Sequence, residues 1–122
     1  METLYTLDGS TITASGVSSV IRTGEGLRTA GYGKRIDRAW LTAYAKGAVS
    51  GADALLVVTY EQQDGLGNYI TIKQLANIIA AGYSTGLLGV DIPISAAGRV
   101  RWTVTGTDPQ FLDVDITLMG HA

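Results

Sequence analysis

Residues 98–118 read GRVRWTVTGTDPQFLDVDITL, and this stretch decides the fold class. Apolar and polar residues alternate over residues 99–105, and they alternate again over residues 111–119. A period of two is the spacing of side chains that share one face of a β-strand. Between the two runs, the residues GTDP at 106–109 combine a glycine, an aspartate and a proline, which favour a turn. We therefore predict two strands joined as a β-hairpin.

The predicted hairpin has one apolar and one charged face. On its second strand, the inward positions are Leu112, Val114, Ile116 and Leu118. The charged face would bring Arg99 and Arg101 opposite Asp113 and Asp115. Each cross-strand pair of opposite charge would contribute about 0.2–1 kcal/mol.

The same alternation recurs along the rest of the chain. Further strands are expected at residues 4–7, 10–14, 17–22, 36–45, 54–60, 69–73 and 87–94. The β-branched run 54–60 is typical of a central strand, and the Asp-Gly and Gly-Asn pairs that follow it predict a hairpin to residues 69–73. Pro93 favours a sheet edge for residues 87–94. Residues 73–81, KQLANIIAA, fit a short helix that Gly82 would cap.

Short strands with frequent turn signals predict an all-β protein. We expect a jelly-roll-like β-sandwich of about eight strands with at most one short helix, and a closed barrel is the alternative. Residues 1–122 would form a single domain. In it, residues 1–35 contribute short strands and a glycine-rich loop that could act as an arm, and residues 36–119 form the main sandwich.

Composition narrows the possible functions. The chain of 122 residues has no cysteine, which excludes disulfides, cysteine zinc sites and thiol catalysis, and its single histidine, His121, argues against a Ser–His pair. A net charge of -2 gives no indication of the basic surface that binds the phosphates of nucleic acid. No stretch supplies the roughly 20 apolar residues of a membrane span. Glu2 stands where a signal peptide would be basic, so we expect no such peptide.

Charged residues make up only 16% of the chain, against roughly 25% in an average globular domain. A small domain has much surface per residue, so this shortage needs an explanation. Because interface cores are depleted in charge, we expect contacts with other subunits to cover part of the surface. The alternative is a surface kept soluble by threonine, serine and glycine.

The glycine-rich residues 23–34 do not form a nucleotide site. A phosphate-binding loop needs Gly-Lys-Ser/Thr, whereas Arg35 follows Gly33 and Lys34, and Arg28 occupies the position of the first glycine. Arg28, Lys34 and Arg35, with Tyr32 among them, instead suggest an electrostatic contact with an acidic partner surface. The alternative is a solvated loop.

Carboxylates and aromatic residues suggest several possible binding or catalytic sites. Glu61, Asp64 and Asn68 could ligate calcium, although their spacing matches no EF-hand. Asp113 and Asp115 would lie roughly 7 Å apart on one strand face, but opposing arginines would keep both ionised and unsuited to general acid catalysis. The aromatic residues on strands could line a sugar platform, but core positions are favoured; they are Trp40, Tyr44, Tyr60 and Trp102. No metal or cofactor is expected.

Residues 98–118 also resemble the C-terminal hairpin of small structural proteins of tailed bacteriophages, namely capsid decoration (cement) proteins and related virion proteins. The matching residues are Arg99, Val100, Arg101, Trp102, Thr103, Val104, Thr105, Gly106, Thr107, Pro109 and Phe111. Residues 39–59 are similar to the paired apolar strands of this family. Residues 1–35 show no likeness to it, and residues 73–86 depart from its plainer strand and turn.

The resemblance implies a non-enzymatic β-sandwich that is made in the bacterial cytoplasm and binds the outer surface of an assembled shell. Its implied partners are the major capsid protein and further copies of itself, with which it would form a homodimer or homotrimer. It transfers no catalytic residue. The alternatives are a tail- or fibre-associated module and a carbohydrate-binding sandwich. The residues that we expect at contacts are Leu4, Tyr5, Arg28, Tyr32, Lys34, Arg35, Asp64 and Asn68.

Overall fold

The computed structural model describes residues 2–21, 38–64, 66–79, 84–91 and 98–121. These residues form seven β-strands and contain no helix, which confirms the all-β class. The strands are β1 (Glu2–Ile12), β2 (Gly16–Val17), β3 (Arg38–Ala45), β4 (Val49–Gln63), β5 (Tyr69–Gln74), β6 (Ser84–Asp91) and β7 (Gly98–His121).

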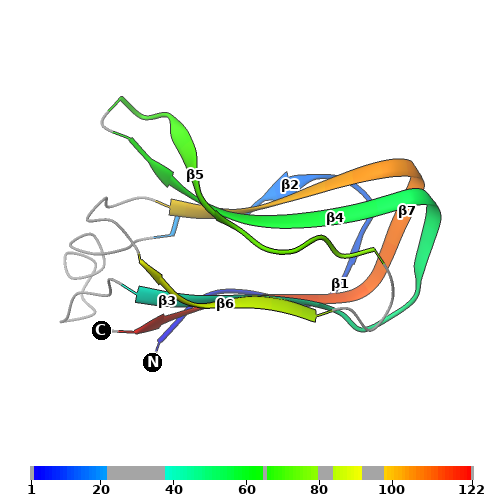
Figure 1. Ribbon diagram of the computed structural model, residues 1–122, viewed down its shortest axis with the longest axis horizontal. Helices are drawn as coiled ribbons and strands as arrows, with labels where there is room; N and C mark the ends of the chain where they lie inside the picture. Colours follow the sequence, from blue (N-terminus) through cyan, green and yellow to red (C-terminus); the bar gives the residue numbers. More distant parts are fainter. Residues whose placement is uncertain (1, 22–37, 65, 80–83, 92–97, 122) are drawn as a thin grey trace.

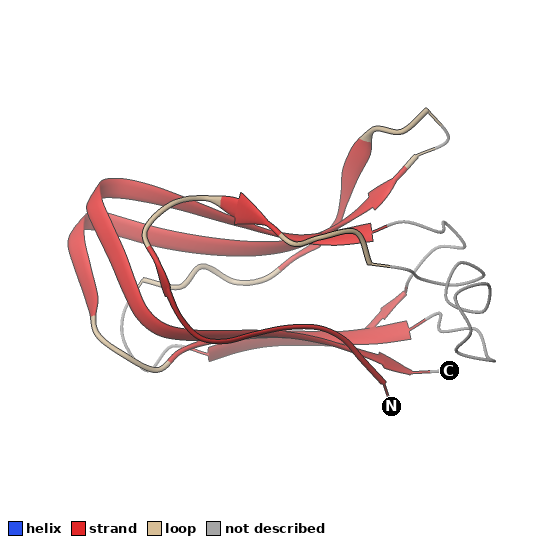
Figure 2. Cartoon of the chain, turned by 180° about the vertical axis from the view of Figure 1, so that it is seen from behind, coloured by secondary structure: helices blue, strands red, loops and turns tan. Residues whose placement is uncertain are grey.

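One antiparallel sheet folds over on itself to make a two-layered sandwich (Figure 1). The long strand β7 runs through both layers. Its first half lies between β4 and β2, and with β5 these strands form what we call the first layer. Its second half lies between β1 and β3, and with β6 these form the second layer. Figure 2 shows the same two layers from behind.

The sheet bends where β4 and β7 pass together from one layer to the other. Residues in the left-handed region gather there: Gly51 and Asp53 on β4 have φ of 106° and 53°, and Gly106 and Asp108 on β7 have φ of 121° and 47°. The pairing register of β4 shifts twice between Ser50 and Leu55. Such bulges bend strands, and glycine and aspartate tolerate this conformation better than most residues.

The predicted hairpin at residues 98–119 is therefore wrong. Residues 106–109 form a corner within β7 instead of a turn between two strands. β4 pairs with β7 on both sides of this corner, from Tyr60 opposite Val100 to Val49 opposite Phe111. This merging, and the joining of residues 4–7 and 10–12 in β1, gives seven strands where about eight were expected.

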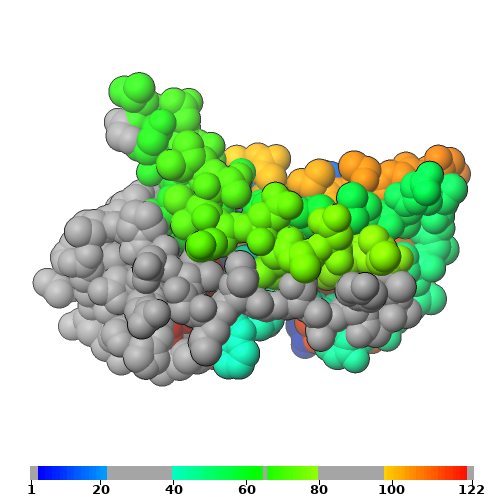
Figure 3. Space-filling model, in the orientation of Figure 1, coloured from blue at the N-terminus to red at the C-terminus, as the bar shows by residue number. Residues whose placement is uncertain are grey.

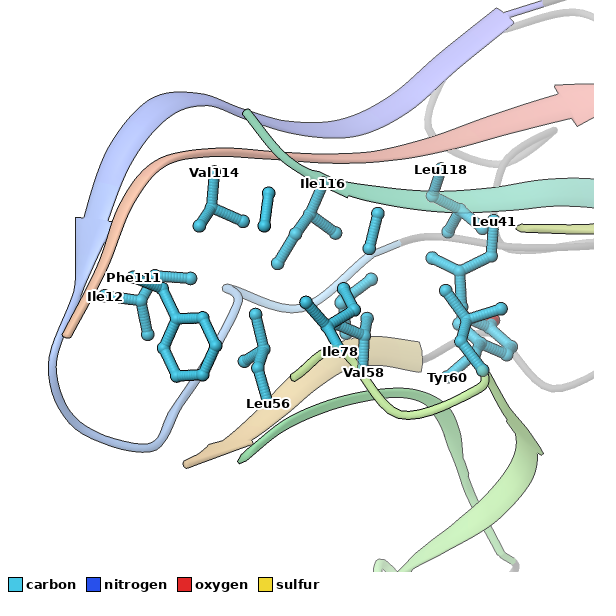
Figure 4. Packing of buried hydrophobic residues seen from close by; sticks show 14 of the residues in the cluster. Ile12, Leu41, Leu56, Val58, Tyr60, Ile78, Phe111, Val114, Ile116 and Leu118 are labelled. Atoms are coloured by element: carbon cyan, nitrogen blue, oxygen red, sulfur yellow. The ribbon is translucent and has the colours of Figure 1, made fainter. Parts of the chain in front are cut away.

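The core lies between the layers, and both contribute to it (Figure 4). Its largest buried side chains are Tyr60, Phe111, Leu41, Leu56, Ile78, Ile116 and Leu118. Val114, Ile116 and Leu118 point inward as predicted, but Leu112 does not and is 36% exposed. The reason is a bulge at Asp113, which has φ of 55° and turns both Phe111 and Val114 towards the core.

The helix predicted at residues 73–81 is also wrong for the part that the structure describes, residues 73–79. Its backbone hydrogen bonds go to β4 instead. The Leu75 amide donates to the Val58 carbonyl at 2.9 Å, and Ile78 and Leu56 exchange two bonds of 2.9 and 3.0 Å. Leu75 and Ile78 are buried because this irregular extended segment covers the open side of the sandwich beside β4. Residues 80 and 81 lie outside the described residues.

Two other expectations concern how the elements connect. β6 is an edge strand, as Pro93 indicated, although Pro93 itself lies outside the described residues. β1 and β2 both pair with β7 of the same chain, so the described part of residues 1–35 belongs to the sandwich. The jelly-roll topology stays a prediction. None of the described residues forms a helix with the length and apolar character needed to cross a membrane.

Candidate interaction surfaces

The hairpin of β4 and β5 projects from the first layer (Figures 1 and 3). Its tip is held by the Asp64 carboxylate, which accepts hydrogen bonds from the Leu66 amide at 2.8 Å and the Asn68 amide at 2.9 Å. The Gln63 side chain adds a bond of 3.1 Å to the Gly67 carbonyl. These contacts present Leu66, which is 89% exposed. Asp64 and Asn68 thus shape the turn, and Leu66 is the apolar group that it displays.

Hydrogen bonds also set the charge of the tip. The amides of Asn68 and then Leu66 hold the pKa of the Asp64 carboxyl below its usual value, against a smaller opposing effect of desolvation. The carboxylate form is the one that accepts these bonds, so the turn is most stable when Asp64 is ionised.

The base of the hairpin is braced by an ion-pair cluster on the outer face of the first layer. Glu61, only 7% exposed, accepts a hydrogen bond from Arg99 Nε at 2.7 Å, and Arg101 Nε lies 3.2 Å from both of its carboxylate oxygens. The Arg99 guanidinium carbon lies 3.8 Å from the centre of the Tyr69 ring. The cluster therefore connects β4, β5 and β7 at the point where the hairpin leaves the sandwich.

The two arginines keep this buried carboxylate charged. Burial raises the pKa of Glu61, but the hydrogen bonds and the Coulombic attraction of Arg99 and Arg101 outweigh it, so the pKa lies below the ordinary value. The predicted pairing of these arginines with Asp113 and Asp115 is wrong. Because β7 bends between the two pairs, they lie in opposite layers.

Asp113 and Asp115 have other partners near the bend. Lys46 Nζ lies 2.9 Å from Asp115 Oδ2 and 3.4 Å from Asp113 Oδ1, and the Gly9 amide donates to Asp115 Oδ1 at 2.8 Å. The hydrogen bond from Lys46, followed by that from Gly9, lowers the pKa of Asp115. The bond to Asp115 likewise raises the pKa of Lys46. These carboxylates therefore tie β1 and the β3–β4 connection to β7.

A second exposed surface lies on the outer face of the second layer. Trp40 and Tyr44 on β3 are 42% and 43% exposed, so the prediction that they are core residues is wrong. The core side of β3 is instead supplied by Leu41, Ala43 and Ala45. The other two aromatic residues of the prediction do face the core: Tyr60 is fully buried, and Trp102 packs against the core and against Gly16.

The structure places the predicted contact residues in three locations. Leu4 and Tyr5 lie in β1 and pack partly against the core, and burial raises the pKa of Tyr5. Asp64 and Asn68 are brought together in the hairpin turn. Four of the predicted residues lie outside the described residues; they are Arg28, Tyr32, Lys34 and Arg35.

The exposed groups that sequence reasoning missed are Leu66, Trp40 and Tyr44. For Leu66 a signal was present, because an apolar residue between two glycines in the turn DGLGN has little chance of being buried. For Trp40 and Tyr44 the signal was that they share a face of β3 with the polar residues Arg38 and Thr42, whereas the other face carries only apolar residues.

The calcium site suggested by the sequence is not supported by the contacts of its members. Glu61 faces two arginines on the sheet, and the Asp64 carboxylate is occupied by amides of the turn. Within the part of the chain that the structure describes, no group of three or more His, Asp or Glu side chains could hold a metal ion.

Comparison with models of known protein families finds no match, and comparison with curated proteins finds no significant relative.

Proposed function

We propose that this protein is a bacteriophage capsid decoration protein, which binds the outer surface of the assembled shell and stabilises it by contact alone. The observation that carries the proposal is the projecting β4–β5 hairpin with its exposed Leu66. A braced hairpin with an apolar tip suits docking into a depression on another protein. The resemblance of residues 98–118 to virion proteins supports the major capsid protein as the proposed partner.

The hairpin reduces the cost of binding because its shape exists before contact. The hydrogen bonds of Asp64 and the ion pairs of Glu61 already order the tip and its base. Ordering a flexible loop at an interface opposes binding, so a preformed loop retains more of the contact energy. Burial of one leucine side chain contributes about 1.5–3 kcal/mol.

A modest contact of this kind is effective on a shell because it is repeated. A protein that binds the assembled lattice better than free subunits shifts the equilibrium towards the lattice. If each copy, or each homodimer or homotrimer, bridges neighbouring shell subunits, its contacts act together and strengthen the binding further. No catalytic group is needed for this role.

The proposal is tested by adding the purified protein to assembled shells that lack it and measuring co-sedimentation. Binding should saturate at a simple ratio to the shell subunit and be much weaker for dissociated subunits. Leu66→Asp should weaken binding at least tenfold, whereas Val20→Asp, at another exposed apolar position in the segment that follows β2, should not. Failure of the wild-type protein to bind any assembled shell would overturn the proposal. Counting copies in purified virions separates shell decoration from a tail- or fibre-associated role, which requires only a few copies.

A further inference from the structure

The outer face of the second layer carries an ordered set of side chains. The pairing of β1, β7 and β3 arranges them in three rows across the strands. The first row holds Thr3, Met119 and Trp40, the second holds Thr6, Thr117 and Thr42, and the third holds Asp115 and Tyr44. We call this set the Trp40 face. The Thr3 hydroxyl lies 3.3 Å from the Met119 sulfur, which ties the first row together.

The two aromatic residues and the threonine row have complementary chemistry. Trp40 and Tyr44 are four residues apart on β3, roughly 13 Å by the rise of a strand, and both residues are more than 40% exposed. Thr42 stands between them and continues across the sheet as Thr117 and Thr6. A hydroxyl row between two apolar groups is unlike the dry apolar centre of most protein–protein interfaces. It matches a ligand that alternates apolar faces with hydroxyl groups.

Charge distribution indicates the ligand class. The first two rows contain no charged side chain. At the far end of the face, Asp113 and Asp115 share Lys46 as their ion-pair partner, so net negative charge remains there. The first two rows therefore complement an uncharged ligand better than a polyanion or a polycation.

We propose that the Trp40 face binds an extended, uncharged polysaccharide of the β-1,4-linked type. Trp40 and Tyr44 stack against the C–H faces of pyranose rings. The Thr42 hydroxyl between them exchanges hydrogen bonds with sugar hydroxyls, and Thr117 and Thr6 lie beside it across the sheet. Extended β-1,4-linked chains are flat ribbons that present C–H faces and hydroxyl groups along one line, as Trp40, Thr42 and Tyr44 lie along β3. Coiled α-linked chains do not present them in this way.

This inference goes beyond shell binding and does not depend on it. The hairpin projects from the first layer, whereas the strands that carry the Trp40 face, β1, β7 and β3, belong to the second layer (Figure 1). A copy that docks through its hairpin can therefore keep the Trp40 face free for sugar. The second function would attach a particle to a polysaccharide-coated surface.

Affinity gel electrophoresis of the purified full chain tests the proposal. Hydroxyethyl cellulose, xylan and glucomannan serve as extended probes, and dextran as the α-linked control. We expect retardation by at least one extended probe and none by dextran. Trp40→Ala and Tyr44→Ala should each weaken binding at least tenfold, and Thr42→Val severalfold. Tyr44→Phe, which keeps the ring, and Val20→Ala, which lies in the segment after β2 and away from the Trp40 face, should bind like the wild type.

Further measurements separate loss of binding from loss of fold or of self-association. Thermal unfolding identifies any variant that no longer folds. If Trp40→Ala and Tyr44→Ala do not fold, the proposal is tested with Thr42→Val, which should bind more weakly, and Tyr44→Phe, which should bind like the wild type. Sedimentation velocity reports self-association. The proposal is overturned if no extended probe retards the wild type, if dextran retards it equally, or if folded Trp40→Ala migrates as the wild type does. Loss of self-association in Trp40→Ala with unchanged retardation would assign the face to contacts between copies and also overturn it.

Discussion

Arg99 donates its Nε–H to the Glu61 carboxylate at 2.7 Å, and this contact joins β7 to β4 at the root of the projecting hairpin. Glu61 is nearly buried, so its charge depends on Arg99 and on the neighbouring Arg101. The pair links a feature of the fold, the continuous strand β7, to the candidate contact surface, because the hairpin of β4 and β5 begins where these residues meet.

Removal of the Glu61 carboxylate should destabilise the protein. Glu61→Ala leaves two arginines without their acceptor, and we expect a loss of about 2 kcal/mol in the free energy of unfolding. Partial exposure of the arginines keeps this below the cost of breaking a fully buried pair. Urea unfolding measures the change. Lys46→Ala, which breaks a more exposed ion pair, should have a smaller effect, and equal losses would contradict the structural role given to Glu61.

Stability should fall in acid partly because of the same residue. The pKa of Glu61 is lower in the folded state than in the unfolded chain, where it is about 4.3. Its contribution is therefore present above the unfolded pKa and is lost as the pH falls through the folded one. Asp115 and Asp64 shift in the same direction and add to the loss.

Unfolding curves at a series of pH values from neutral downward measure this dependence. Glu61→Gln should flatten the acid part of the profile, because the glutamine cannot titrate. A variant profile parallel to that of the wild type would show that Glu61 does not contribute.

Loosening the hairpin tip should affect binding more than stability. Asp64→Ala removes the acceptor for the amides of Leu66 and Asn68, so hydrogen exchange at these two amides should become faster. Shell binding should weaken because the tip must then be ordered on contact. Asp64→Asn keeps an acceptor oxygen and should retain most of the protection. If Asp64→Ala leaves both exchange rates unchanged, the carboxylate does not hold the turn.

The corner of the sandwich should tolerate no side chain at Gly106. This residue has φ of 121°, and a Cβ atom there would lie 2.9 Å from the carbonyl oxygens of Ala52 and Asp53. Gly106→Ala should therefore cost well over 1 kcal/mol of stability. Gly67→Ala is the matched control, since its φ is also positive, at 89°, but a Cβ there would meet only Gln63 Nε2, at an ordinary contact distance of 3.8 Å. Equal losses in the two variants, measured by thermal unfolding, would show that backbone strain alone matters.

Local patterns in the sequence were sufficient for the fold class and for most strands. Residues 54–60 and 69–73 lie in β4 and β5, joined as the predicted hairpin, and residues 38–45 form β3. The alternation of apolar and polar side chains expresses which residues can face a core, and it acts within a few residues of each position. For the candidate surface, the turn around Asp64 and Asn68 was located, but the exposed group that it carries, Leu66, was not.

The remaining features were decided by the tertiary structure. Residues 106–109 suit a turn and a corner equally well, and the extended pairing of β4 along all of β7 selects the corner. That bend separates Arg99 from Asp113, and Arg99 forms its ion pair with Glu61 instead. Both faces of β3 carry large apolar residues, and packing between the layers placed Leu41 and two small alanines inside and Trp40 outside. The sequence by itself thus determined where strands form, because that depends on near neighbours. Which strands meet, and which face is buried, depended on residues distant in the chain competing for one core.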